Sequence, residues 1–370
     1  MQNAQLINDY AAANTKPEEK GLRKYIKITL LLLLTIFIFW IFGRNLDWAQ
    51  VRSTLSQANP WYLSAAVLII STGYLLRAIR WKVLLAPITE SSLKELFATT
   101  TVGFSAIFLI GRMGEIVRPM WLPMRDRRVR PSAALVTLGL ERIFDLAALV
   151  CFFAFNLLWF TPPAGYEYVG WIGWLMLAGV IAGFAALIIF QRNSETVLVW
   201  LEKVTTRTWI PERIQYIILS VTRQLGSALA ILRDWRQTFW VSFWTFLLWL
   251  AIAVPTWFVL LAFHLPLTFS DSLFIMGFAT VAAIVPTPGG AAGAFHAATA
   301  AGLIVLGTEK NDAAAVSFAM HLIYFAPAIF FGLYYLIHGD ISIERFRSLM
   351  SSENAEREIE SDSPDFVPET

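Results

Sequence analysis

The chain has 370 residues, of which 57% are hydrophobic and only 15% are charged, and its mean hydropathy is +0.58. Several apolar runs reach the length of a bilayer span, so the composition excludes an ordinary soluble domain and predicts an all-α, polytopic membrane protein. The single cysteine, Cys151, excludes a disulfide framework or a cysteine metal site within one chain. The formal net charge is only +2, and we expect no nucleic-acid partner.

Six apolar runs are long enough to cross a bilayer. In chain order they are Tyr25–Phe42, Trp61–Leu85, Ser132–Phe160, Gly170–Phe190, Phe239–Phe263 and Ala313–Ile337. The first run is followed by GRNLDW rather than by a small-residue cleavage site, so we expect a retained span and not a cleaved signal peptide. A polar tail of residues 1–24 and an acidic tail of residues 339–370, which we expect to be disordered, flank the predicted membrane domain of residues 25–338.

Two further apolar stretches are interrupted, and we expect each to enter the membrane and return as a re-entrant hairpin. Phe97–Ile110 has only about 15 apolar residues, short of the roughly 20 that a helical crossing needs. Ser272–Leu306 is cut near its middle by the sequence PTPGG, Pro286–Gly290. The alternative is a protein of eight spanning helices with two kinks at glycine or proline.

The distribution of cations supports six spans and two hairpins. With the N-terminus in the cytoplasm, about 24 Lys and Arg residues fall in cytoplasmic segments and about 3 fall outside, as the positive-inside rule requires. Both termini are then cytoplasmic, and the two hairpins open from opposite sides. This arrangement is typical of an inverted repeat whose broken helices form a substrate site near the midplane, so we expect the two breaks to face each other or a common cavity.

The segment GRMGEIVR, which ends the first hairpin, combines two glycines with three charges. Charged side chains at membrane depth are costly and usually serve a function. The glycines permit a tight turn, Arg112 and Arg118 offer planar donor groups suited to a lipid phosphate, and Glu115 can orient them. The alternative, a cytoplasmic loop that only follows the positive-inside bias, fits this spacing poorly.

The third predicted span carries Glu141, Arg142 and Asp145 in its first half, and helical spacing places Asp145 on the same face as the other two. These charges can neutralise one another, either as a structural ion-pair cluster or as part of a substrate site. Because one arginine faces two carboxylates, we expect a further arginine, Arg112 or Arg118, to balance the group.

The break in the second hairpin has the sequence PTPGGAAGAFH and ends at His296. Prolines end one half-helix, and Gly289 and Gly290 let the chain turn before the next half-helix, whose N-terminus is a candidate anion site. His296 is a candidate to contact a headgroup or to carry a proton, although a lone histidine is more often a packing residue. His264 and His321 have no metal-ligand spacing with it, so we expect no metal and no cofactor.

Two segments are predicted to serve the membrane surface. Arg77–Lys82 ends the second span, where we expect the cations to snorkel to the interface and Trp81 to act as an anchor, with a headgroup contact as the secondary alternative. Apolar residues at helical spacing between Ile214 and Leu229 predict an amphipathic helix on the cytoplasmic surface, or equally a helix packed against the bundle.

These elements resemble, in their order along the chain, the lysylphosphatidylglycerol synthase transmembrane region family, which is the flippase-like domain of the multiple peptide resistance factors. The resemblance rests on Arg77–Trp81, GRMGEIVRP, Glu141–Asp145 and PTPGGAAGAFH, and it spans nearly the whole membrane region. It implies translocation of a lipid across the bilayer. The two-part members carry a soluble aminoacyltransferase domain, whereas the acidic tail here has only about 30 residues, too few for a folded transferase.

We therefore expect a lipid transporter of the bacterial plasma (inner) membrane, not an enzyme, whose partner is a phospholipid or another anionic amphiphile. The sequence has no GxxxxGK[ST] run, so coupling to an ion gradient or to the lipid gradient is expected. The alternative is a membrane-embedded transferase or phosphatase that uses the same carboxylates on a lipid phosphate. A homo-oligomer is left open.

Overall fold

The computed structural model describes residues 29, 33, 36–126, 128–129, 131–159, 169–207, 215, 219, 222, 229, 234–282, 285 and 288–338. Every element in this part of the chain is a helix, which confirms the all-α prediction. The helices are α3 (Trp48–Gln57), α4 (Pro60–Leu85), α5 (Leu93–Ile110), the 3-10 helix η1 (Gly111–Ile116), α6 (Val117–Arg125), α7 (Pro131–Trp159), α8 (Val169–Arg192), α9 (Ser194–Arg207), α11 (Trp235–Ala262), α12 (Phe269–Ala282), α13 (Pro288–Val305) and α14 (Lys310–His338).

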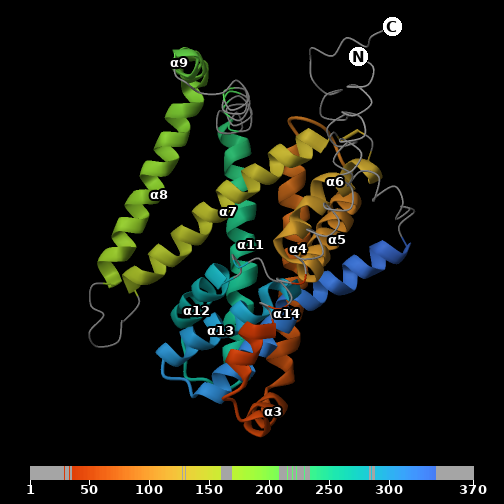
Figure 1. Cartoon of the computed structure of the whole chain (residues 1–370), viewed down its shortest axis with the longest axis vertical. Helices are drawn as coiled ribbons and strands as arrows, with labels where there is room; N and C mark the ends of the chain where they lie inside the picture. The colour runs from red at the N-terminus through yellow and green to blue at the C-terminus, as the bar shows by residue number, and fades with distance from the viewer. Residues whose placement is uncertain are drawn as a thin grey trace, which may run out of the picture.

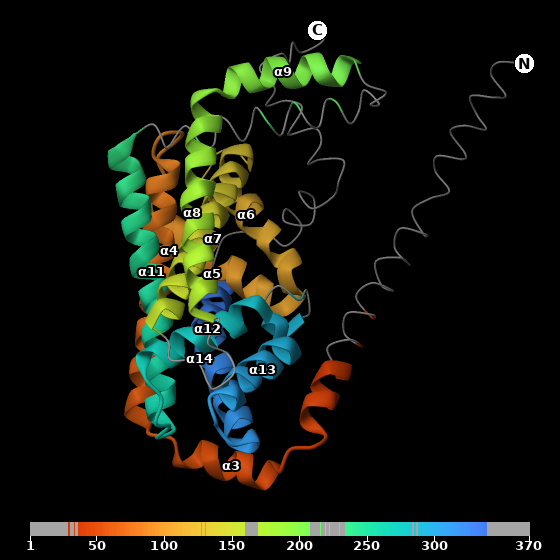
Figure 2. The ribbon, with the colours of Figure 1, turned by 90° about the vertical axis from the view of Figure 1, so that its left-hand side faces the viewer.

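The bundle has two ends, which we name the α3 end and the α9 end after the helices that lie there (Figure 1, Figure 2). At the α3 end, the backbone amide of Asn59 donates to the carbonyl of Ala262 at 2.8 Å, so α4 starts where α11 finishes. The backbone amide of Asp47 donates to Asn311 Oδ1 at 3.0 Å, which ties the start of α3 to the start of α14. Helices α4 and α14 therefore run from the α3 end toward the α9 end, and α11 runs back.

Among the described residues, five helices are long and apolar enough to cross a membrane: Pro60–Leu85, Leu93–Ile110, Trp174–Arg192, Trp235–Ala262 and Lys310–His338. Four of them coincide with predicted spans, and the 29-residue α7 occupies the predicted span that carries three charges. The first predicted span begins outside the described residues. Helix α5 also meets the length requirement, so the hairpin interpretation depends on where the chain goes after Ile110.

The chain turns back after α5 instead of continuing across the bundle. Gly111, with φ +70°, ends α5, and η1 and α6 lead the chain back. Glu95 in the first turn of α5 forms an ion pair with Arg125 in the last turn of α6, and the Thr89 hydroxyl donates to the carbonyl of Arg128 at 3.1 Å. Both ends of the segment thus meet at the α9 end, and the first predicted hairpin is confirmed.

A second charged pair closes the same end of this hairpin. The carboxylate of Asp126 accepts hydrogen bonds from Arg128 Nε at 2.9 Å and from Arg128 Nη2 at 2.8 Å. These bonds lower the pKa of Asp126 to about 2, against the opposing effect of its burial. The carboxylate is therefore ionised at neutral pH, and the turn after α6 is held by a charged pair.

Helices α12 and α13 form the second hairpin, which begins and ends at the α3 end. Short connections join α11 to α12 and α13 to α14, and α12 packs against α13. Gly289, Gly290 and Ala291 have φ values of +75°, +63° and +61°, so regular right-handed helix begins only after Ala291. This confirms the predicted helix break, although Pro286 and Thr287 of the same motif lie outside the described residues.

The two hairpins open toward opposite ends of the bundle and meet inside it, where α13 contacts both α5 and η1. Helix α8 stands apart from this core and packs on α7, with α9 lying across its end (Figure 1, Figure 2). The amphipathic helix predicted between Ile214 and Leu229 lies almost entirely outside the described residues. Helix α9 lies earlier in the same connection between α8 and α11.

Candidate functional site

A cavity of about 530 Å³ lies where the two hairpins meet. The first hairpin contributes Phe104, Ile107 and Glu115 to its wall, and the second contributes Met276, Ala279, Thr280, Val281 and Phe295. Helices α4, α7, α11 and α14 supply the remaining wall. The volume falls within the roughly 300–1,000 Å³ that small-molecule sites occupy. Both hairpins border this cavity, but of the two predicted breaks only the first contributes a described lining residue, Glu115.

Arg118 and Glu141 form a buried ion pair in which Glu141 lines the cavity and Arg118 lies behind it. Arg118 Nη1 and Nη2 donate to Glu141 Oε2 and Oε1 at 2.8 and 3.2 Å, and each residue is only 1% exposed. The Arg118 guanidinium also lies over the Trp81 ring, 4.4 Å from its centroid. A charge buried this deeply needs a partner, and the bidentate geometry provides one. The prediction that Arg118 balances the carboxylates of α7 is thus confirmed.

Arg80 forms the second bidentate pair of this network. Its Nη1 and Nη2 donate to Asp145 Oδ1 and Oδ2 at 2.5 and 3.2 Å, and its Nη2 lies 3.7 Å from Glu141 Oε2. Nη1 also donates to Thr245 Oγ1 on α11 at 3.3 Å. Two arginines and two carboxylates from α4, α6 and α7 therefore neutralise one another inside the bundle.

The predicted snorkelling of Arg77–Lys82 to the interface is wrong for three of its residues, and the secondary alternative, a headgroup contact, stays a prediction. Arg80 is 1% exposed because it faces α7 and α11 across the bundle. Trp81 is 0% exposed, and its Nε1 donates to Thr137 Oγ1 at 2.9 Å, so it is no interface anchor. Arg77 lines the cavity. A sequence signal existed, because Arg77, Arg80 and Trp81 are three and four residues apart and share one helix face.

Arg142 lies at the rim of the cavity rather than at the centre of the network. Its Nε is 3.8 Å from Glu115 Oε2 and its Nη1 is 3.8 Å from Asp145 Oδ2, and its side chain is 46% exposed. Glu115 was predicted to orient Arg112 and Arg118. Among the described side chains its carboxylate pairs with Arg142, and Arg118 pairs with Glu141. This rim pair brings η1 of the first hairpin next to α7.

Arg77 is the cavity-lining cation with the least compensation. Its guanidinium stands 4.7 Å from the ring centroid of Phe104 and 5.4 Å from that of Tyr74, and it forms no ion pair with any residue that the structure describes. The charged side chains in and behind the cavity wall are the arginines Arg77, Arg80, Arg118 and Arg142 and the carboxylates Glu115, Glu141 and Asp145. Four cations against three anions leave this described group with a net charge of +1.

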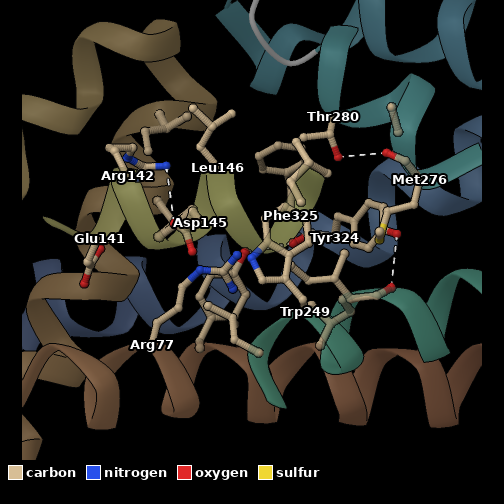
Figure 3. A pocket seen from close by; sticks show the side chains of 18 of the residues that line it. Arg77, Glu141, Arg142, Asp145, Leu146, Trp249, Met276, Thr280, Tyr324 and Phe325 are labelled. Carbon is tan, nitrogen blue, oxygen red and sulfur yellow. Dashed lines mark hydrogen bonds and ion pairs between the residues drawn. The ribbon is translucent and has the colours of Figure 1, made fainter. Parts of the chain in front are cut away.

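The cavity has a charged half and an apolar half (Figure 3). Arg77, Arg142 and Asp145 lie together in the charged half, and Trp249 and Phe325 lie in the other half. Along α4, the order of residues places the charged half toward the α9 end and the apolar half toward the α3 end. The arrangement suits a ligand with an anionic part and an apolar part.

The remaining predicted site residues that the structure describes, Gly289, Gly290 and His296, do not line the cavity. The side chain of Arg112 lies outside what the structure describes. Gly290 packs against the ring of Phe325, which lines the cavity, and a Cβ there would come within 2.6 Å of that ring, so Gly290 lies directly behind the cavity wall. His296 is 4% exposed and contacts the His321 ring at a centroid distance of 4.7 Å. It therefore lies one aromatic layer away from the cavity.

Comparison with known proteins identifies the membrane domain as a whole. Residues 27–332 match the family model described as the lysylphosphatidylglycerol synthase TM region, and this range contains every residue that lines the cavity. A search among curated proteins found no match. The apolar helices and the matched family together show an integral membrane protein. The chain belongs to the lysylphosphatidylglycerol synthase transmembrane region family.

Proposed function

We propose that the chain translocates an anionic phospholipid across the membrane and binds its phosphate through Arg77 and Arg142. Arg77 is the observation that carries this proposal. It stands eight residues before the end of α4 at Leu85, about 12 Å along the helix axis, and has no carboxylate paired with it among the described residues. A cation at such depth is costly without a counterion, and a phosphodiester supplies one negative charge to a group of net charge +1.

The carboxylates beside the cavity support binding more than acid–base chemistry. Both oxygens of Glu141 accept hydrogen bonds from Arg118, and both oxygens of Asp145 accept hydrogen bonds from Arg80. A general base must reach a substrate proton with a free lone pair. Each carboxylate is neutralised by a bidentate arginine, which makes it a poorer proton acceptor, so the geometry favours a translocation role in which the two groups hold the arginines.

The proposal is tested by lipid translocation in proteoliposomes that contain fluorescent phosphatidylglycerol, with the outer-leaflet dye quenched chemically. Arg77→Gln should lower the translocation rate about ten- to hundredfold, because a hydrogen bond to a charged group contributes about 1.5–3 kcal/mol. Arg77→Lys should retain part of the rate, since it keeps the charge but loses the planar fork. Lys82→Gln is the matched control, because Lys82 is an exposed cation of the same helix outside the cavity.

The expected control result is a wild-type rate for Lys82→Gln. A wild-type rate for Arg77→Gln would remove Arg77 from the phosphate site. Wild-type protein that moves no more lipid than protein-free vesicles would contradict the translocation proposal itself.

A further inference from the structure

Two residues of the cavity wall are also largely exposed on the outside of the protein. Leu146 of α7 is 63% exposed and Val281 of α12 is 64% exposed, yet both line the cavity. A side chain that borders an interior space and the exterior at once marks a mouth. The cavity therefore opens through the side of the bundle, between α7 and α12.

This mouth lies far from both ends of the bundle. Leu146 stands near the middle of the 29-residue α7. Val281 is the last but one residue of α12, at the inner tip of a hairpin that begins at the α3 end. In an integral membrane protein, a lateral opening at this depth faces the hydrocarbon core, where acyl chains and not water are the surrounding medium.

Arg142 stands beside Leu146, one helical turn earlier on the same face of α7. It lies eleven residues into α7, about 16 Å along the helix axis, and its side chain remains 46% exposed. Its two carboxylate neighbours are both 3.8 Å away, too far for hydrogen bonds. A half-exposed arginine at this depth is costly, and because its two ion pairs are not hydrogen bonds, its donors are free to bind an anionic headgroup held in the mouth.

We infer that the gap between α7 and α12 is a lateral portal in which the acyl chains of the bound lipid rest, with the phosphate at Arg142 and Arg77 and the chains leaving past Leu146 and Val281. This inference rests on the proposed function and specifies its ligand as a lipid that keeps its chains in the bilayer. A cavity of about 530 Å³ holds a headgroup with its glycerol and leaves the chains outside. A free phosphate ester would fill the same charged half without using the portal.

The test places a large ring in the mouth and measures lipid and headgroup separately. Leu146→Trp and Val281→Trp should each lower translocation of fluorescent phosphatidylglycerol at least tenfold and should lose phosphatidylglycerol that co-purifies with the wild type in native mass spectrometry. Binding of soluble sn-glycerol 3-phosphate to the detergent-purified protein should stay within twofold of wild type in both variants, and Arg77→Gln should abolish it. Leu135→Trp is the matched control, since Leu135 is 58% exposed on α7 and does not line the cavity.

The possible outcomes distinguish the portal inference from the translocation proposal. Wild-type lipid translocation and retention in both tryptophan variants would overturn the portal and leave the proposed function standing. Loss of glycerol 3-phosphate binding together with lipid in those variants would also overturn it, because the ring would then have damaged the headgroup site. If the wild type retains lipid that Leu146→Trp loses, yet moves none, the portal stands and the translocation proposal fails.

Discussion

At the residue scale, the arginines of the bundle divide into two kinds that look alike in the sequence. Arg80 and Arg118 are each 1% exposed and donate bidentate hydrogen bonds to the carboxylates of α7, whereas Arg77 and Arg142 line the cavity without such a bidentate partner among the described residues. The need for a balancing arginine was predictable from two carboxylates and one cation on α7. Which arginine fills that role depends on how α4 and α6 are rotated against α7, and spacing within one helix does not contain that information.

The buried pair of Arg118 and Glu141 should therefore behave as a unit in stability measurements. Arg118→Met alone leaves two carboxylates with one buried arginine, Arg80, and should cost about 3–5 kcal/mol, as does the removal of one partner from other buried pairs. Arg118→Met combined with Glu141→Gln restores the balance, so the double variant should unfold at a higher temperature than the single variant. Thermal unfolding of detergent-purified protein gives the comparison.

Arg142→Ala serves as the control for this measurement, because its side chain is 46% exposed and both of its carboxylate neighbours are 3.8 Å away. We expect it to lower the unfolding temperature less than Arg118→Met does. A double variant no more stable than Arg118→Met would show that the two residues are not energetically coupled.

At the element scale, the two hairpins were predictable because glycine and proline residues mark their helix breaks in the sequence. Gly111 has φ +70°, and Gly289 and Gly290 have φ +75° and +63°, which are left-handed conformations that side chains disfavour. The length argument for the first hairpin was less secure, because α5 extends to Leu93 and is itself long and apolar enough to cross. The pairing of Glu95 with Arg125 closes the hairpin, and a contact between residues that far apart has no local sequence pattern.

Gly114 tests the turn of the first hairpin directly. A Cβ at this position would lie 2.4 Å from the backbone carbonyl carbon of Ala106 and 2.4 Å from the backbone nitrogen of Ile107. Backbone atoms cannot move aside as a flexible side chain can, so Gly114→Ala should separate η1 from α5. The loss of stability should reach or exceed the cost of about 1–3 kcal/mol that is typical of overpacking. The loss should appear in the thermal unfolding temperature and as weaker binding of glycerol 3-phosphate, because Glu115 on η1 lines the cavity.

Gly139→Ala is the matched control, since Gly139 is a helical glycine of α7 whose added Cβ would meet nothing within 4 Å. Alanine is the better helix former by about 1 kcal/mol, so this change should be neutral or slightly stabilising. Equal unfolding temperatures for the two alanine variants would contradict the close packing of η1 on α5.

At the scale of the whole molecule, the described cations separate toward the two ends of the bundle. Lys82, Lys94, Arg125, Arg128 and Arg192 belong to the α9 end, and Arg44, Arg52 and Lys310 belong to the α3 end. The structure fixes which residues share an end, and the positive-inside rule then assigns the end richer in cations to the cytoplasm. That assignment remains a prediction about orientation, and it follows from charge alone.

Cysteine labelling tests the arrangement of the ends and their orientation together. In a Cys151→Ala background, Arg128→Cys at the α9 end and Arg52→Cys at the α3 end both offer exposed positions. A membrane-impermeant maleimide added to intact cells should label only the Arg52 position, and the Arg128 position should react only after the membrane is opened, because the end with more cations stays inside. Labelling of both positions from one side would contradict a bundle whose hairpins open toward opposite faces of the membrane. Exchange of the two results would instead keep the fold and reverse the orientation, so that the charged half of the cavity would lie toward the outer leaflet and the lipid would enter the phosphate site from there.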